Sequence, residues 1–174
     1  MSDIYEIENN AIDGEDEMGS LNHSTVQTNL AGLLKFKCEK KLAVMTDLSL
    51  DISSHDLSPY QIETKGELKP DVCAYFKRPL IPDEVDDLIT VSTMPDLAIE
   101  ILSPKQALNY LVRKIRAYLA LGIKSCWLVI PATQTINVYS CSKQPLQHRT
   151  FTLETPEVVD DIIGIRLSME EIFE

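Results

Sequence analysis

The segment that most constrains the fold is the apolar run "DLAIEIL" at residues 96–102. It is the most apolar segment of strand length in the chain, and a continuous apolar run of this length is typical of a buried strand. We therefore expect it to lie near the centre of a sheet. Its interior nevertheless contains Glu100. A carboxylate in a strand core is costly unless a partner or an ion holds it, so Glu100 is a candidate functional residue.

The segment after this strand gives the clearest helix pattern in the chain, over residues 103–122. Ser103 is a good N-cap, Pro104 suits the first helical position, and Gly122 is typical of a residue that ends a helix. The pattern predicts a helix with one buried face. Its apolar stripe consists of Leu108, Leu111, Val112, Ile115, Tyr118 and Leu119.

The other segments predict a fold that mixes helices and strands. A helix is expected over 24–41, capped by Ser24 or Thr25. Residues 77–95 contain three prolines and an acidic run, which predicts a long loop with room for a short helix. The order of elements predicts an α/β or α+β fold with a mixed sheet. Strands are expected over 42–53, 70–76, 125–130 and 135–140, with a loop or hairpin over 54–69 and a strand and helical turn over 160–173.

Length and charge narrow the class of protein. A chain of 174 residues favours one domain, preceded here by an acidic lead-in over 1–19 that holds seven of the 27 acids and no Lys or Arg. The net charge of −11 argues against tight nonspecific binding of nucleic acid. The sequence contains no apolar run of membrane-spanning length and no signal pattern, so we expect a cytoplasmic protein. Its four cysteines include no C-x-x-C pair, which disfavours a zinc site.

Two carboxylates could meet on neighbouring strands. Asp71 opens the strand at 70–76, and pairing of that strand with the one at 96–102 would bring Asp71 beside Glu100. Close carboxylates repel, and the usual resolution is a divalent cation or a shared proton. Oxygen ligands at such a site suit Mg²⁺ or Mn²⁺. Asp96 lies about 13 Å from Glu100 along the strand, so we interpret it as a turn acid.

Other chemistry-bearing residues give weaker patterns. Lys114 lies about 100° from the centre of the helical stripe, on a flank from which a long side chain can reach over the sheet edge. The pattern alone favours a solvated lysine at this position. His23 precedes the first predicted helix, and neither His55 nor His148 has a neighbour at metal-ligand spacing. The sequence also lacks a Gly-rich phosphate loop and a nucleophile elbow.

Three stretches together resemble a known family. They are "PDVCAYF" at 70–76, the run from Pro95 to Pro131, and "NHSTVQTNLAGLL" at 22–34. They are similar to the Uma-type restriction endonuclease family of the PD-(D/E)xK nuclease superfamily, whose first helix often begins with His. The resemblance covers roughly residues 20–173. It implies a single restriction-endonuclease-like domain over 20–174, with a mixed central sheet flanked by helices.

The resemblance assigns a role to each matching position. Asp71 corresponds to the aspartate of the motif and Glu100 to its second acid, with the backbone carbonyl of Ile101 as a further metal ligand. The usual lysine position is Leu102, and Lys114 on the following helix matches the family's displaced lysine. These assignments imply a catalytic set of Asp71, Glu100 and Lys114.

Some positions depart from the family pattern. Lys105 stands in place of the usual serine, Tyr110 in place of an aspartate four residues before Lys114, and Ile130 in place of an aspartate before Pro131. An upstream acid often joins such sites, and Glu15 matches it in a loosely aligned segment. These departures leave room for altered or lost activity.

The function implied is hydrolysis of DNA phosphodiester bonds with Mg²⁺ or Mn²⁺ as cofactor. Related nucleases commonly dimerise to cut two strands, so the resemblance allows a homodimer. The alternative hypothesis is a noncatalytic nucleic-acid- or protein-binding module on the same fold, favoured by the net charge of −11. A glycosidase that works with two carboxylates and no metal is disfavoured by the placement of Glu100 in a strand core. It is also disfavoured by the lack of aromatic residues that could stack on a sugar, since the one Trp, Trp127, lies within a strand.

Overall fold

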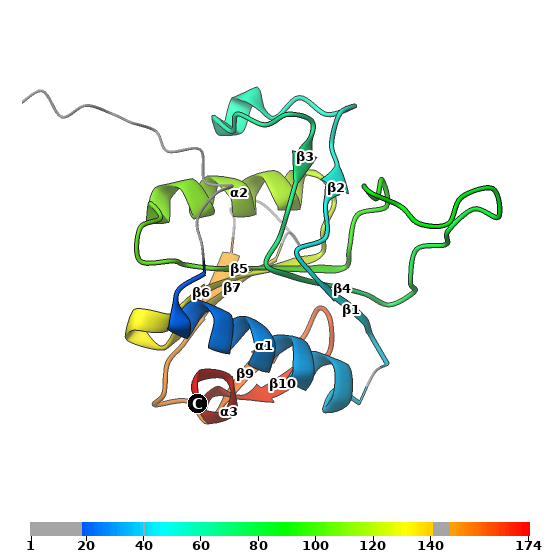
Figure 1. Cartoon of the computed structure of the whole chain (residues 1–174). Coiled ribbons are helices and arrows are strands. Elements are labelled where there is room, and N and C mark those ends of the chain that lie inside the picture. The colour runs from blue at the N-terminus through cyan, green and yellow to red at the C-terminus, as the bar shows by residue number, and fades with distance from the viewer. Residues whose placement is uncertain (1–18, 40, 141–146) are drawn as a thin grey trace, which may run out of the picture.

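A six-stranded mixed sheet runs through the molecule, as the computed structural model of residues 19–39, 41–140 and 147–174 shows (Figure 1). The strand order is β1-β4-β5-β6-β7-β8. Neighbouring strands are antiparallel except β5 and β6, which are parallel because a helix connects them. The strands are β1 (Ala43–Thr46), β4 (Val72–Tyr75), β5 (Leu97–Ile101), β6 (Ser125–Ile130), β7 (Thr135–Ser140) and β8 (Gln147–Phe151).

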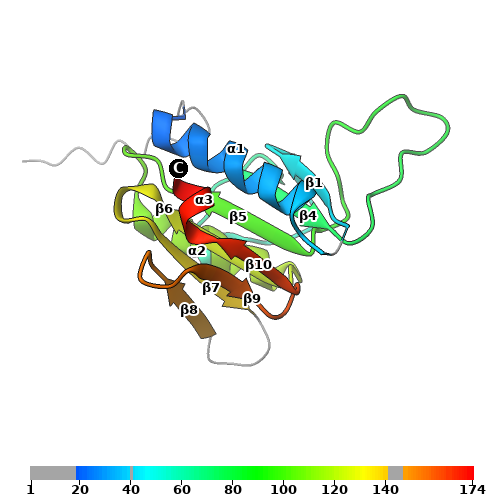
Figure 2. The ribbon, with the colours of Figure 1, turned by 90° about the horizontal axis from the view of Figure 1, so that it is seen from below.

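Helices cover both faces of this sheet. Helices α1 (Leu21–Phe36) and α3 (Met169–Phe173) pack on one face, and α2 (Leu108–Ala120) packs on the other (Figures 1 and 2). Two-stranded ribbons and single 3₁₀ turns fill the periphery. They are β2 (Leu50–Asp51) with β3 (Glu67–Leu68), β9 (Glu157–Asp160) with β10 (Ile165–Ser168), η1 (Ser58–Tyr60) and η2 (Pro131–Thr133).

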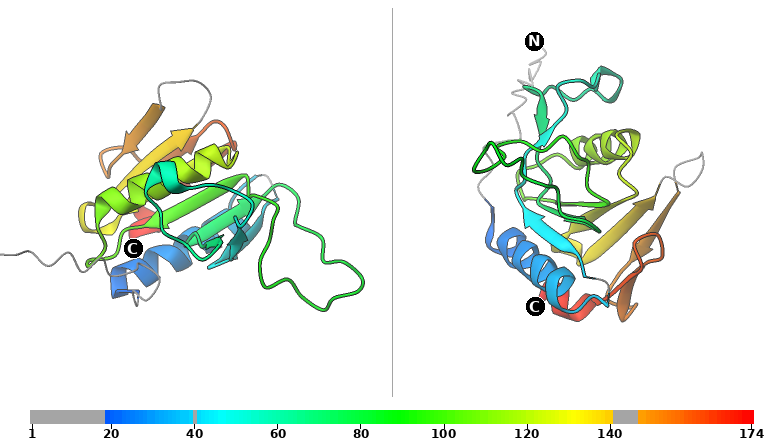
Figure 3. Two further views of the ribbon diagram at one scale, coloured as in Figure 1. Left: turned by 90° about the horizontal axis from the view of Figure 1, so that it is seen from above. Right: turned by 90° about the vertical axis from the view of Figure 1, so that its right-hand side faces the viewer.

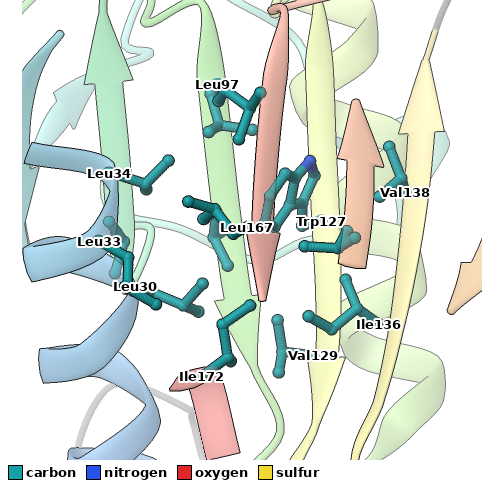
Figure 4. Close-up of a cluster of buried hydrophobic side chains, with 14 of the residues drawn as sticks. Leu30, Leu33, Leu34, Leu97, Trp127, Val129, Ile136, Val138, Leu167 and Ile172 are labelled. Atoms are coloured by element: carbon teal, nitrogen blue, oxygen red, sulfur yellow. The ribbon is translucent and has the colours of Figure 1, made fainter. Parts of the chain in front are cut away.

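The buried side chains form one core on each face. Alternate residues of β5 separate cleanly, with Leu97, Ile99 and Ile101 in the core under α1 and Ala98 in the core under α2. Trp127 and Val129 of β6 join the α1 side, together with Leu30 and Leu34 (Figure 4). The prediction that 96–102 forms a buried central strand is confirmed, as is the mixed sheet flanked by helices.

Helix α2 begins later than its sequence predicts. The expected N-cap, Ser103, instead starts a turn in which the Gln106 amide donates to the Ser103 carbonyl at 3.1 Å. The Gln106 side chain in turn accepts from the Ser103 amide at 3.4 Å. The backbone amide and carbonyl of Ser103 are therefore both hydrogen-bonded within this turn, without a helix start at this position. The prediction for the other end is confirmed. Gly122 has φ +91°, and its amide donates to Leu119 O at 3.1 Å.

Helix α1 begins one turn earlier than expected. Ser20 is its N-cap, and the Ser20 hydroxyl accepts from the His23 amide at 3.3 Å. The prediction of Ser24 or Thr25 as the cap was therefore wrong, because a third suitable hydroxyl lies one turn upstream. This shift places His23 inside the first turn of α1.

The segment 42–53 is also divided, where its sequence predicts one strand. Asp47 adopts φ +52°, so β1 ends before this residue and the chain turns before β2 begins. Residues 77–95 form a long loop with no helix, so only the loop part of that prediction is confirmed. Strands β8 and β9 had no clear apolar pattern and were missed. Among the described residues, no helix has the length and apolar character needed to cross a membrane.

A buried carboxylate ties β6 to the C-terminal ribbon. Asp160 is 2 % exposed, and one of its oxygens accepts from the Ser125 hydroxyl at 2.5 Å and the Trp127 indole at 2.8 Å. Its other oxygen accepts from the amides of Ile162 and Ile163 at 3.0 and 3.2 Å. Four donors therefore converge on one buried acid, which satisfies the requirement that a buried charge be fully hydrogen-bonded.

We expect Asp160→Ala to lower the free energy of unfolding by about 3 kcal/mol, because it removes the buried acceptor that these four donors share. Urea unfolding followed by tryptophan fluorescence measures the change. The neighbouring Asp161→Ala is the matched control, since the Asp161 side chain is 71 % exposed in a surface ion pair with Arg149, and such a pair contributes at most about 1 kcal/mol. Equal losses in the two variants would contradict the role given to Asp160.

Candidate functional site

The first two candidate residues lie side by side at one end of β4 and β5. These strands pair antiparallel, with Val72 opposite Ile99. Continuing this register by one residue puts Asp71, which directly precedes β4, opposite Glu100 near the end of β5. The expectation that the two strands pair and bring the two acids together is confirmed.

Glu100 is held by two donors from α2. Its side chain is 2 % exposed, and the Tyr118 hydroxyl donates to Oε1 at 2.7 Å. Lys114 Nζ lies 2.9 Å from Oε1 and 3.1 Å from Oε2, and it also donates to the Lys69 carbonyl at 2.9 Å. The Lys114 side chain is only 12 % exposed, so the interpretation of it as a solvated lysine was wrong. Tyr118 was predicted only as part of the apolar stripe.

Burial dominates the acid–base properties of this pair. It raises the pKa of Glu100 to about 7, with the charge of Lys114 opposing the rise and that of Asp71 adding to it. Burial alone would lower the pKa of Lys114, but attraction to Glu100 outweighs it, and the pKa of Lys114 is raised. Burial and the neighbouring Glu100 raise the pKa of Tyr118 well above its usual value, so its hydroxyl stays protonated. Lys114 therefore carries a proton throughout the neutral range, whereas Glu100 changes charge within it.

Asp71 is held by groups from α1 and from the neighbouring strand β5. His23 Nε2, from the first turn of α1, lies 3.2 Å from Asp71 Oδ1, and the Ile101 amide donates to Oδ2 at 2.6 Å. The Gln27 side chain donates to the Asp71 carbonyl at 2.9 Å. A contact between His23 and Asp71 was not predicted from the sequence. The signal that could have found it is the histidine that often opens the first helix of the family resembled.

The hydrogen bond with Asp71 raises the pKa of His23, against the lowering effect of burial. A histidine whose pKa is higher in the folded state stabilises the fold below the unfolded pKa of about 6.5, and this stabilisation is lost as pH rises through the folded pKa. We therefore expect His23→Gln to destabilise the protein by about 2 kcal/mol at pH 5.5, and by clearly less at pH 8.5.

Urea unfolding at the two pH values measures this difference, with His55→Gln, on an exposed turn, as the matched control. The control variant should change stability by less than about 0.5 kcal/mol at either pH. A His23→Gln effect that is the same at both pH values would show that the imidazole does not form a charged pair with Asp71.

A polar cavity of about 280 Å³ lies between the start of α1, the adjacent ends of β4 and β5, and α2. Asp71, Glu100 and Lys114 all line it, so the structure brings together the three side chains that the sequence singled out. Leu102, at the usual lysine position, packs instead beside the α2 core. Asp96 binds Lys124 at 2.7 Å and the Phe76 amide at 2.7 Å, away from the cavity. Further lining residues include His23, Gln27, Asp47, Glu63, Thr64, Lys69, Ser103, Gln106 and Tyr110.

The donor set of this cavity fits a hard divalent cation. Two carboxylates on adjacent strands face one polar cavity, and each carboxylate oxygen can accept more than one partner. Among the described residues, no three His, Cys, Asp or Glu side chains are grouped so that they could share an ion. Mg²⁺ is usually held by one or two carboxylates together with water and substrate phosphates, so two acids are enough for this ion. Glu15 lies outside the described residues.

Comparisons with known proteins show the family and the fold of this chain. The model of a family described as "Uma2: Putative restriction endonuclease" matches residues 4–170. A crystal structure of a putative nuclease belonging to DUF820 from Anabaena variabilis has a TM-score of 0.69 and 21% sequence identity, with 90% of this chain and 83% of that chain covered. At this identity the likeness shows the fold. The search of curated proteins gave no match.

Proposed function

Because the chain belongs to the Uma2 putative restriction endonuclease family, we propose that it is a divalent-metal-dependent nuclease that hydrolyses phosphodiester bonds in DNA. The observation that carries this proposal is Glu100. It is a carboxylate buried in a central strand, beside a second carboxylate and an ammonium group, at the wall of a polar cavity. Perturbed ionisable groups that converge on a cavity are typical of active sites.

Asp71 and Glu100, with the main-chain carbonyl of Ile101, are the residues that would hold Mg²⁺ or Mn²⁺. Such an ion, when bound, activates water and stabilises negative charge on a phosphate. The chain's own part is to keep the two acids fixed. His23 and the Ile101 amide hold Asp71, and Tyr118 holds Glu100. Side chains fixed in this way need little reorganisation when a substrate binds.

Lys114 supplies a fixed positive charge in this proposal. Its ammonium group contacts both carboxylate oxygens of Glu100 and donates to the Lys69 carbonyl. Lys114 also lines the cavity, where a water molecule or a phosphate oxygen would lie within its reach. An ammonium group in this position orients the attacking water or neutralises charge that develops on the phosphate.

The second candidate function is a noncatalytic binding module on the same fold. The observation that favours it is charge, because Asp47 and Glu63 add two more acids to the cavity wall of a chain that already carries −11. A cavity of this kind repels polyanions when no cation is bound. Binding of a partner that survives EDTA and the Glu100→Gln change would identify this function.

Cleavage of plasmid, linear duplex and single-stranded DNA with Mg²⁺, Mn²⁺ or EDTA tests the proposal directly. We expect cleavage of at least one substrate with either ion and none with EDTA. Protein carrying Asp71→Asn is included to exclude a contaminating nuclease, and Asp161→Asn is the matched surface control. The absence of metal-dependent cleavage at high enzyme concentration on all three substrates would refute catalysis.

A further inference from the structure

The first turn of α1 forms one wall of the cavity that holds the candidate site. Figures 1 and 3 show the start of α1 at the same end of the molecule as the start of α2. Gly19, His23 and Ser24 all line the cavity. Ser20 caps this end of the helix, and the first turn contains no acidic side chain. The N-terminal end of a 16-residue helix carries a partial positive charge, and no acid of this turn offsets it.

One nitrogen of the His23 ring has no partner in this wall. The His23 side chain is 10 % exposed, and its Nε2 lies 3.2 Å from Asp71 Oδ1. Its Nδ1 is buried and has no hydrogen-bond partner among the described residues. Helical side chains lean toward the N-terminus of their helix, so the ring lies beside the residues that precede α1. A buried polar atom that lacks a protein partner points to a bound water or ligand.

Gly19 leaves space beside this nitrogen. A Cβ atom at position 19 would lie 3.4 Å from His23 Nδ1 and 2.8 Å from Ser24 Oγ. The second distance is shorter than a normal contact of a Cβ atom, so any side chain at position 19 would fill this space. The result is a small recess in the cavity wall, bounded by an imidazole nitrogen, a hydroxyl group and the end of a helix.

We infer that this recess binds a phosphate group of the nucleic-acid substrate. A helix N-terminus binds phosphate through its backbone amides and its partial charge, and a hydroxyl group adds a donor. His23 Nε2 faces a carboxylate, so the ring can carry a hydrogen on both nitrogens and donate through Nδ1. Gly19 is exposed and has no side chain to fix it, so its backbone can shift to admit the ligand. The assignment to nucleic acid rests on the proposed function, whereas the binding of phosphate does not.

The charged residues around the cavity decide how tightly phosphate binds. Those that line it are Asp47, Glu63, Lys69, Asp71, Glu100 and Lys114. Asp71 is paired with His23, and Glu100 is paired with Lys114. Glu174 lines a separate pocket that also includes Leu21 and Asn22 of the first turn. Because acids outnumber lysines here, phosphate alone should bind weakly, and Mg²⁺ should tighten its binding by offsetting negative charge.

Titration of ¹⁵N-labelled protein with inorganic phosphate at pH 7, with and without Mg²⁺, tests the subsite without a need for cleavage. We expect saturable shifts of the backbone amides of residues 19–24 and of the His23 ring nitrogens. Gly19→Ala fills the recess and should raise the dissociation constant at least about tenfold. Gly32→Ala is the matched control, because a Cβ atom at Gly32 meets nothing within 4 Å, and it should bind phosphate like the wild type.

A second variant, Ser24→Ala, removes a donor without adding an atom. It should raise the dissociation constant by a smaller factor, about threefold. Ser24 and Gly19 are both exposed, so thermal unfolding of the variants should remain close to that of the wild type. Together the two variants separate the filling of the recess from the loss of a hydrogen bond.

Short single strands of DNA distinguish a terminal phosphate from an internal one. Anisotropy with Mg²⁺ compares strands that carry phosphate at both ends with strands that carry none, after electrophoresis has shown that they remain intact. If the subsite holds a terminal phosphate, the phosphorylated strand should bind at least about fivefold more tightly, and Gly19→Ala should remove this difference. If it holds an internal phosphate, both strands should bind equally, and Gly19→Ala should weaken both.

The absence of shifts at residues 19–24 in both conditions, or equal phosphate binding by the wild type and Gly19→Ala, would overturn the subsite. Metal-dependent cleavage of DNA without these shifts would refute the subsite alone. Shifts that Gly19→Ala abolishes, in a protein that cleaves no DNA, would support the subsite and refute catalysis. The outcome for the subsite is therefore independent of the outcome for the nuclease activity.

Discussion

Glu100→Gln should lower the rate of DNA cleavage at least about 1000-fold at saturating Mg²⁺, because a neutral amide is a poor ligand for a hard cation. The side chain keeps its size, and its amide oxygen can still accept the Tyr118 hydroxyl. Initial rates on supercoiled plasmid measure the loss. The matched control is Glu154→Gln, which makes the same chemical change at an exposed position.

This variant also removes the counter-charge of a buried ammonium group, so its folding must be checked. Removing one partner of a buried pair typically destabilises a protein by about 3–5 kcal/mol. The double variant Glu100→Gln/Lys114→Met removes both charges and should recover much of that loss while remaining inactive. If the double variant is stable and cleaves DNA within about tenfold of the wild-type rate, Glu100 is not a ligand of the metal that catalysis requires.

Lys114→Met should lower the cleavage rate about 100- to 1000-fold, which is the effect typical of removing one electrostatic contact to the transition state. Lys114→Arg keeps the charge but not the compact ammonium geometry, so it should recover only part of the rate. Divalent-metal binding should survive in both variants, since neither change removes a carboxylate. This separation of metal binding from the rate distinguishes Lys114 from Glu100.

The stability of Lys114→Met should depend on pH. Burial raises the pKa of Glu100 to about 7 in the wild type, so Glu100 is neutral at pH 5 and charged at pH 8.5, where Lys114 compensates the charge. Without Lys114 this pKa rises further, so the variant loses more stability relative to the wild type at pH 8.5 than at pH 5. We expect a loss of about 3 kcal/mol at pH 8.5 and a clearly smaller loss at pH 5. Lys124→Met is the matched control, because Lys124 pairs with Asp96 and its side chain is 54 % exposed. A loss for Lys114→Met that does not change with pH would show that the Glu100 charge is not what Lys114 compensates.

The sequence predicted the centre of this fold better than its boundaries. The continuous apolar run of β5 and the glycine that ends α2 have local physical causes, so both predictions were confirmed. The start of α2 was wrong because Ser103 has two competing uses, as a helix cap and as the first residue of a tight turn. Tertiary context makes that choice, and the spacing of residues does not record it.

The site shows a similar division. The cost of burying a carboxylate in an apolar strand identified Glu100 from the sequence alone. Helical spacing put Lys114 on a flank but could not show that its side chain turns inward, and only the family resemblance selected it. His23 and Tyr118 were missed because their contacts with Asp71 and Glu100 join segments that are distant or appear apolar in the sequence. Such contacts depend on how the layers pack.

The central claim is that Asp71 and Glu100 hold one divalent cation, and isothermal titration of Mn²⁺ tests it without a need for the correct DNA substrate. The wild type at pH 8 should bind Mn²⁺, and Asp71→Asn/Glu100→Gln should not. Binding to the wild type should weaken at pH 6, because a proton on Glu100 then competes with the ion. Equal binding by the wild type and the double variant, or no binding by the wild type at pH 8, would contradict the account.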